Sequence, residues 1–128
     1  MKLDPTTIET LQPYFPDMDL TGVSVIESGP MCWLVRNLLK QGAMTFSPFV
    51  FYGRDSLDTS KASSLALLAH ELCHVQQYRR RGHAAFLARY WLDQARNRGR
   101  YSRDLPLEAP CYELQRRVRE DLQARGFA

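Results

Sequence analysis

Residues 70–74 read His-Glu-Leu-Cys-His, with two histidines four positions apart and a glutamate directly after the first. Four residues make slightly more than one turn of an α-helix, so His70 and His74 would project from one face and bind one metal ion together. In this HExxH motif the glutamate faces the water that the metal activates. The pentapeptide therefore predicts one zinc ion per chain, with His70 and His74 as ligands and Glu71 as the general base.

A hydrolytic zinc site usually takes three protein ligands and leaves its fourth position to water. Glu108 is the favoured third ligand. It opens an expected helix and follows the apolar Leu107, and a carboxylate placed among apolar residues without a partner would be costly. The helix dipole alone also favours an acidic residue at a helix start, so a structural role stays open. His83 directly follows the helix-ending Gly82 and is too close to the motif in sequence to fold back to a metal near the middle of the helix. We expect it to be a solvated loop or cap residue.

The motif lies in a long helix that we expect to begin after an N-cap at Asp58 or Thr59 and to run to Arg81, where Gly82 ends it. The two histidines fall on a polar stripe of this helix. Its large apolar residues fall on the opposite face: Leu65, Leu68, Leu72 and Val75.

The other elements follow from the apolar spacing and from the positions of proline and glycine. We expect short helices over residues 3–14 and 32–40, a strand over 20–27, and later helices over about 84–97, ended by Gly99, and from 107 to just before Gly126. Residues 43–52 change phase across Ser47-Pro48, which indicates either one edge strand with a bulge or two strands joined by a turn. The predicted fold is α+β: a single domain over residues 1–128, with a small sheet of two to three strands, then the HExxH helix and two further helices.

The composition is that of an ordinary globular domain, with 128 residues, 45% of them hydrophobic and 24% charged. Neither a membrane span nor a secretory signal is evident, so we expect synthesis in the cytoplasm and no membrane partner, with export by a dedicated secretion or injection system left open. The three cysteines, Cys32, Cys73 and Cys111, are widely spaced and odd in number, which favours free thiols. Cys73 and Cys111 are expected to pack in the core.

Positive charge is concentrated in the second half of the chain. Residues 79–128 carry 12 cationic residues, all of them arginines, against 6 acidic residues. Solvated helix faces are the simpler interpretation, because arginine stems cover apolar surface while the guanidinium groups stay in water. A basic surface for nucleic acid or for an acidic protein partner is the alternative.

The motif and the residues after it resemble a known family. Residues 69–78, Phe86, Tyr90, Tyr101 and the segment 105–108 are similar to small zincin-like metallopeptidase domains associated with bacterial contractile injection systems. The resemblance covers roughly residues 20–118 and is strongest at 69–78. It implies that His70, His74 and Glu108 bind zinc, as in gluzincins, and that Glu71 is the catalytic acid and base. The sequence departs from the family pattern at two positions. Pro110 lacks the backbone N–H donor that is usual there, and Cys111 stands where a small residue is usual.

These patterns predict a zinc-dependent metallopeptidase acting on a peptide or protein substrate, and the family resemblance implies a protein of an effector or toxin-like kind. Tyr78, Tyr112, Tyr101 or His83 would stabilise the charge that develops on the substrate carbonyl oxygen. The aromatic segment 43–52 would align an extended substrate by adding it to the sheet as a further strand. Two alternatives remain: an arginine-rich protein- or nucleic-acid-binding module with a structural zinc, and an inhibited domain in which a cysteine blocks the water position.

Overall fold

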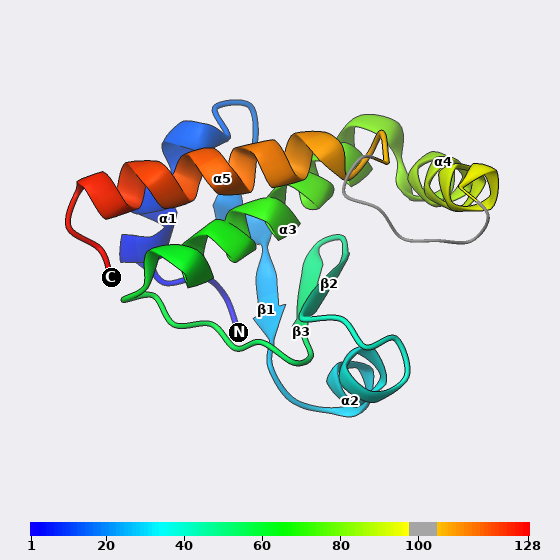
Figure 1. Cartoon of the computed structure of the whole chain (residues 1–128), viewed down its shortest axis with the longest axis horizontal. Helices are drawn as coiled ribbons and strands as arrows, with labels where there is room; N and C mark the ends of the chain where they lie inside the picture. Colours follow the sequence, from blue (N-terminus) through cyan, green and yellow to red (C-terminus); the bar gives the residue numbers. More distant parts are fainter. Residues whose placement is uncertain (98–104) are drawn as a thin grey trace.

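The computed structural model describes residues 1–97 and 105–128 (Figure 1). In these residues one three-stranded sheet is combined with five α-helices, which confirms the predicted α+β fold. The strands are β1 (Ser24–Ile26), β2 (Ala43–Phe46) and β3 (Phe49–Tyr52). The helices are α1 (Pro5–Leu11), α2 (Pro30–Asn37), α3 (Ala62–Arg81), α4 (His83–Arg96) and α5 (Ala109–Ala124), with short 3₁₀ helices at Gln12–Tyr14 and Leu20–Gly22.

The sheet has the order β1-β3-β2, with β1 parallel to β3 and β2 antiparallel to it. Ser47 and Pro48 form the turn between β2 and β3, so the second of the two interpretations of residues 43–52 is confirmed. Proline is tolerated there because it lies outside the ladder, where no backbone donor is needed. Among the described strands, β2 is therefore an edge strand, and it runs beside α3.

Helix α3 lies between the sheet and α5, which runs back along it (Figure 1). The leucine face of α3 is buried, as its spacing predicts, with Leu68 and Leu72 fully inaccessible. The two histidines on the opposite, polar stripe are also buried, so α3 is covered on more than its leucine face. Small residues recur on α3 at three- and four-residue intervals and let neighbouring elements approach closely: Ala62, Ala66, Ala69 and Cys73.

The start of α3 differs from the prediction. Lys61 is its N-cap residue, so neither Asp58 nor Thr59 caps the helix. The Asp58 carboxylate instead accepts hydrogen bonds from the backbone N–H and the hydroxyl of Ser60, at 3.0 and 2.6 Å. The Asp58 side chain thus closes a local turn ahead of the helix instead of capping its first turn.

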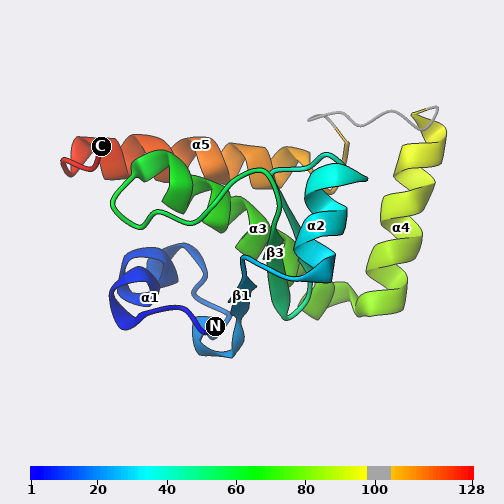
Figure 2. The same cartoon turned by 90° about the horizontal axis from the view of Figure 1, so that it is seen from below.

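The end of α3 confirms the prediction. Gly82 has a φ of 83°, a conformation that glycine adopts without steric cost, and its N–H donates to the Tyr78 carbonyl at 2.7 Å. Helix α4 begins at the next residue and projects from the end of α3, at the opposite side of the molecule from α1 (Figure 2). It ends at Arg96, and the expected stop at Gly99 lies outside the described residues. None of the helices that the structure describes is long and apolar enough to span a membrane.

Candidate metal centre

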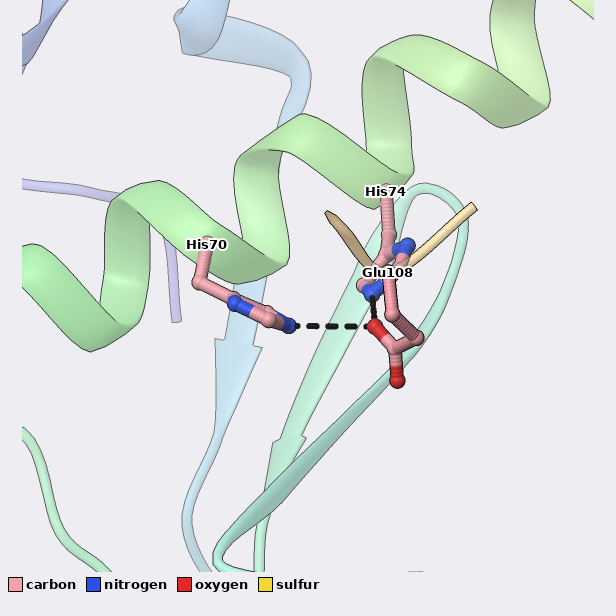
Figure 3. A group of neighbouring side chains, drawn as sticks. All are labelled: His70, His74 and Glu108. Carbon is pink, nitrogen blue, oxygen red and sulfur yellow. Dashed lines mark hydrogen bonds and ion pairs between the residues drawn. The ribbon is translucent and has the colours of Figure 1, made fainter. Parts of the chain in front are cut away.

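Three buried side chains from two parts of the chain converge beside α3 (Figure 3). Nε2 of His70 lies 3.3 Å from Oε1 of Glu108, and Nε2 of His74 lies 2.6 Å from the same oxygen. The three residues are between 4% and 7% exposed. The structure thus brings together the three metal ligands that the sequence predicts.

The histidines and the glutamate reach this point for different reasons. His70 and His74 are one helical turn apart on α3, and their ring centroids lie 5.0 Å from each other. Glu108 is the N-cap residue of α5, and its backbone N–H donates to the Leu105 carbonyl at 2.8 Å. Pro110 occupies the first turn of α5, where a backbone N–H has no partner within the helix, so this departure from the family pattern is compatible with the orientation of Glu108.

The electrostatics of the group suit a divalent cation. Burial raises the pKa of Glu108, but hydrogen bonds from His70 and His74 outweigh it and lower that pKa to about 2. Burial lowers the pKa of His74, whereas the hydrogen bond to Glu108 and the charges of Glu71 and Glu108 raise it to about 9. The carboxylate is therefore ionised at neutral pH, and a bound cation would replace the proton that His74 shares with it.

The donor set also fits a metal ion. Two imidazole nitrogens and one carboxylate oxygen are directed at one buried point, and all lie within 4.8 Å of one another. Nitrogen and oxygen donors of this kind suit zinc in a three-ligand site. His70, His74 and Glu108 could therefore hold a metal ion.

Glu71 lies on the same helix but makes a different contact. Its carboxylate is buried and accepts a hydrogen bond from the hydroxyl of Thr45 on β2, with an Oγ1–Oε2 distance of 2.5 Å. The same hydroxyl lies 3.1 Å from the backbone oxygen of Glu71. Glu71 does not join the ligand group, as expected for a general base rather than a metal ligand.

A pocket of about 320 Å³ opens onto these side chains. Its lining comes from β2, α3, α4 and α5, together with loop residues that flank the β2–β3 hairpin. The ligand group and Glu71 all line it. The remaining lining residues are mostly apolar or aromatic: Gln41, Gly42, Ala43, Met44, Thr45, Asp55, Leu67, Tyr78, Phe86, Leu87, Tyr90, Trp91, Tyr112 and Gln115.

The residues predicted to stabilise the substrate oxygen separate into two groups. Tyr78 and Tyr112 line the pocket; the ring of Tyr112 packs against His70 at 4.4 Å, and the Tyr78 hydroxyl donates to the Thr45 carbonyl at 3.3 Å. His83 lies outside the pocket lining, where its Nε2 is 2.7 Å from the Ser47 carbonyl oxygen. His83 is exposed, as expected, but it is the first residue of α4 and Gly82 is the cap, so it is neither a loop nor a cap residue. Tyr101 lies outside the described residues.

Sequence reasoning missed three polar residues at the site. Tyr90 lines the pocket from α4, and burial together with the charge of Glu108 raises its pKa to about 12. Thr45 contacts Glu71, and Gln77 contacts His74. The position of Gln77 on the histidine face of the helix was a usable signal, and so was the place of Tyr90 among the residues that carry the family resemblance, whereas nothing local marks Thr45.

The two cysteines near the site belong to the hydrophobic core, as predicted. Sγ of Cys111 lies 3.7 Å from Nδ1 of His74, on the ring edge away from Nε2, which faces Glu108, and 3.5 Å from the Leu107 carbonyl oxygen. Neither Cys73 nor Cys111 lines the pocket. This arrangement argues against the alternative in which a thiol blocks the water position.

Several arginines of the second half are paired within the protein. Arg116 binds Glu113 and Glu120 along α5, and Arg89 binds Asp93 along α4. Arg79, Arg80 and Arg81 are exposed in the last turn of α3, where positive charge complements the helix dipole. These positions agree with the simpler interpretation of the arginine content.

The protein therefore has an α+β fold in which two buried histidines of an HExxH helix meet a buried glutamate from the start of a neighbouring helix. The sequence profile of the eCIS core domain matches residues 3–82, and the chain belongs to this family, which is associated with extracellular contractile injection systems. No curated protein and no solved structure matches the chain.

The matched residues define which part of the site the family covers. They include α1, the sheet and α3, and therefore His70, Glu71 and His74. The match begins and ends earlier than the expected span of residues 20–118, and it leaves out α4, α5 and Glu108. The association with injection systems is confirmed, and the assignment of Glu108 depends on the tertiary structure.

Proposed function

We propose that this protein is a zinc-dependent metallopeptidase. One observation carries the proposal: Glu71 and the group formed by His70, His74 and Glu108 line the same pocket. A purely structural metal site is usually closed by a fourth protein ligand. Within the described residues the group has three ligands, and beside it lie a carboxylate and space for a substrate.

Zinc at this site would polarise the scissile carbonyl and make a water molecule acidic near neutral pH. Glu71 takes a proton from the attacking water and returns it to the leaving amine. Thr45 holds the Glu71 carboxylate through its hydroxyl, so the base has a defined orientation. A phenol group from Tyr78, Tyr90 or Tyr112 stabilises the substrate oxygen as it becomes charged.

The substrate would be an extended peptide that lies along β2. This strand is at an edge of the described sheet, and Ala43, Met44 and Thr45 line the pocket from it. An edge strand offers unpaired backbone groups that an extended segment can bind. Family membership supports a role as an effector, or as a processing enzyme that acts with an injection system.

Metal content tests the proposal first. Wild type and the variants His74→Ala and Glu108→Ala are purified without added metal, and zinc per chain is measured by elemental analysis. We expect one zinc in wild type and a large loss in both variants. No zinc in wild type, even after refilling, contradicts the proposal.

Hydrolysis is tested next with zinc-loaded protein and a mixture of unstructured peptides, read by mass spectrometry. Glu71→Gln is the matched control, because it keeps the metal ligands and removes the general base. Cleavage by wild type alone supports a peptidase. Bound zinc without cleavage by any preparation favours the alternative function, a binding module with a structural zinc.

A further inference from the structure

Gln77 connects two parts of the metal group. Its side chain lies one turn after His74 on α3 and is half-buried. Oε1 of Gln77 lies 2.9 Å from Nδ1 of His74, and Nε2 of Gln77 donates to the Leu107 carbonyl at 2.9 Å. One amide therefore contacts both a ligand imidazole and the residue directly before the ligand Glu108.

The two contacts determine the orientation of the amide. An amide oxygen only accepts hydrogen bonds and an amide nitrogen only donates them. Because the Leu107 carbonyl is an acceptor, it requires the nitrogen, and Oε1 is left to face His74. Nδ1 of His74 must then carry the proton, which leaves Nε2 to face Glu108 and a metal ion.

The second contact acts on Glu108. Leu107 is buried against Tyr78 and Phe86, so its carbonyl has a well-defined position. Cys111 also bonds this carbonyl, but at 3.5 Å and through sulfur, which is the weaker donor. Of the two hydrogen bonds that the Leu107 carbonyl accepts from side chains, the one from the Gln77 amide is therefore the stronger.

His70 has no equivalent support in the described part of the chain, where its buried Nδ1 has no hydrogen-bond partner. The ring of Tyr112 packs against it instead. The polar contacts that orient the ligands are thus concentrated at His74, where the sulfur of Cys111 adds only a distant contact of 3.7 Å.

We propose that Gln77 is the positioning residue of this metal centre, setting the tautomer of His74 and holding the segment that delivers Glu108. The inference rests on the metal-binding part of the proposed function and is independent of peptide hydrolysis. Loss of a partner that orients a metal ligand typically costs about 10- to 100-fold in metal affinity.

The test compares zinc affinities of the full chain by competition with a chelator of known affinity. Gln77→Met keeps the length of the side chain and removes both polar atoms. Gln76→Met is the matched control, because Gln76 is also half-buried on the same helix and has no polar contact among the described residues. We expect about a 10- to 100-fold weaker affinity for Gln77→Met and a change below about twofold for Gln76→Met.

Gln77→Glu separates the two contacts, because a carboxylate accepts from His74 but cannot donate to Leu107. We expect its affinity to lie between those of Gln77→Met and wild type. The absorption spectrum of bound Co²⁺, which reports ligand geometry, should change in Gln77→Met and stay close to wild type in Gln76→Met. A variant that only loosens packing would lower the melting temperature without altering this spectrum.

Wild-type affinity in Gln77→Met would overturn the inference, and so would an equal loss in Gln76→Met. If Gln77→Met does not fold, Gln77→Glu decides, since unchanged affinity and an unchanged Co²⁺ spectrum would both contradict a positioning role. Absence of zinc from wild type would instead remove the proposed function itself, so the two failures are distinguishable.

Discussion

The hydroxyl of Thr45 lies 2.5 Å from the carboxylate of Glu71, which joins the edge strand β2 to the HExxH helix α3. Both residues are buried, and both line the pocket beside the metal group. The strand proposed to bind the substrate therefore also orients the proposed general base. A substrate held along β2 would be fixed relative to Glu71 through a single hydrogen bond.

Replacing Thr45 should affect hydrolysis more than metal binding. Thr45→Val keeps the branched shape and removes the donor, so Glu71 loses a hydrogen bond of about 1.5 to 3 kcal/mol. We expect kcat/KM to fall by about 10- to 100-fold with zinc content unchanged. Thr45→Ser keeps the hydroxyl and should retain most of the activity; an equal loss in both variants would show that packing, not the hydrogen bond, matters.

Tyr90 should contribute to catalysis without contributing to metal affinity. Its hydroxyl is in the pocket near the charge of Glu108, and the proposed role is donation to the substrate oxygen. For Tyr90→Phe we expect a fall in kcat of about 100-fold with little change in KM, as measured for donors of this type. Unchanged kcat would transfer the role to Tyr112 or Tyr78, which the matching phenylalanine variants would identify.

The stability of the metal-free protein should depend on pH through the pair formed by His74 and Glu108. The pKa of His74 is raised to about 9, so its contribution is complete below about pH 6.5 and is lost as the pH rises through about 9. The pKa of Glu108 is lowered to about 2, so its contribution is present above about pH 4.5 and is lost as the pH falls through about 2.

Chemical unfolding in the presence of a chelator measures this dependence. We expect the pair to stabilise the metal-free protein most between about pH 4.5 and 6.5. The difference in unfolding free energy between wild type and Glu108→Gln should shrink as the pH is raised from 6.5 to 10. A difference that stayed constant over that interval would contradict the raised pKa of His74.

Zinc affinity should show the opposite trend at high pH. A metal ion must displace the proton that His74 holds up to about pH 9, so the apparent affinity should rise by up to about tenfold per pH unit between pH 7 and 9. Titration with a zinc chelator at several pH values measures this slope. A flat profile would mean that His74 carries no proton in this range.

Thiol alkylation should not activate the protein. Cys73 is 7% exposed and Cys111 is fully buried, and neither lines the pocket, so neither thiol can block the position of the attacking water. We expect slow labelling of the native zinc-loaded protein and no gain in peptide cleavage afterwards. Cleavage that begins only after labelling of either cysteine would revive the inhibited-domain alternative.

The sequence was sufficient for features that depend on neighbouring residues. The helical period places His70 and His74 on one face of α3, and glycine at position 82 ends that helix, because these effects act within one turn. The turn at Ser47-Pro48 and the order of helices and strands along the chain were also predictable, because each depends on the residue types within a short segment. The prediction that Asp58 or Thr59 caps α3 was wrong, because the Asp58 carboxylate instead binds the backbone N–H of Ser60.

Only the tertiary structure decided which distant residues meet the HExxH motif. Glu108 reaches His74 across 34 residues, and Thr45 reaches Glu71 across 26, because α5 and β2 pack against different sides of α3. The burial of the histidines themselves depends on that packing, which no periodicity within α3 encodes. Sequence spacing thus placed His70, Glu71 and His74 within one turn of a helix and proposed Glu108 as their partner, while the packing of separate elements brought Glu108 to the histidines and formed the pocket.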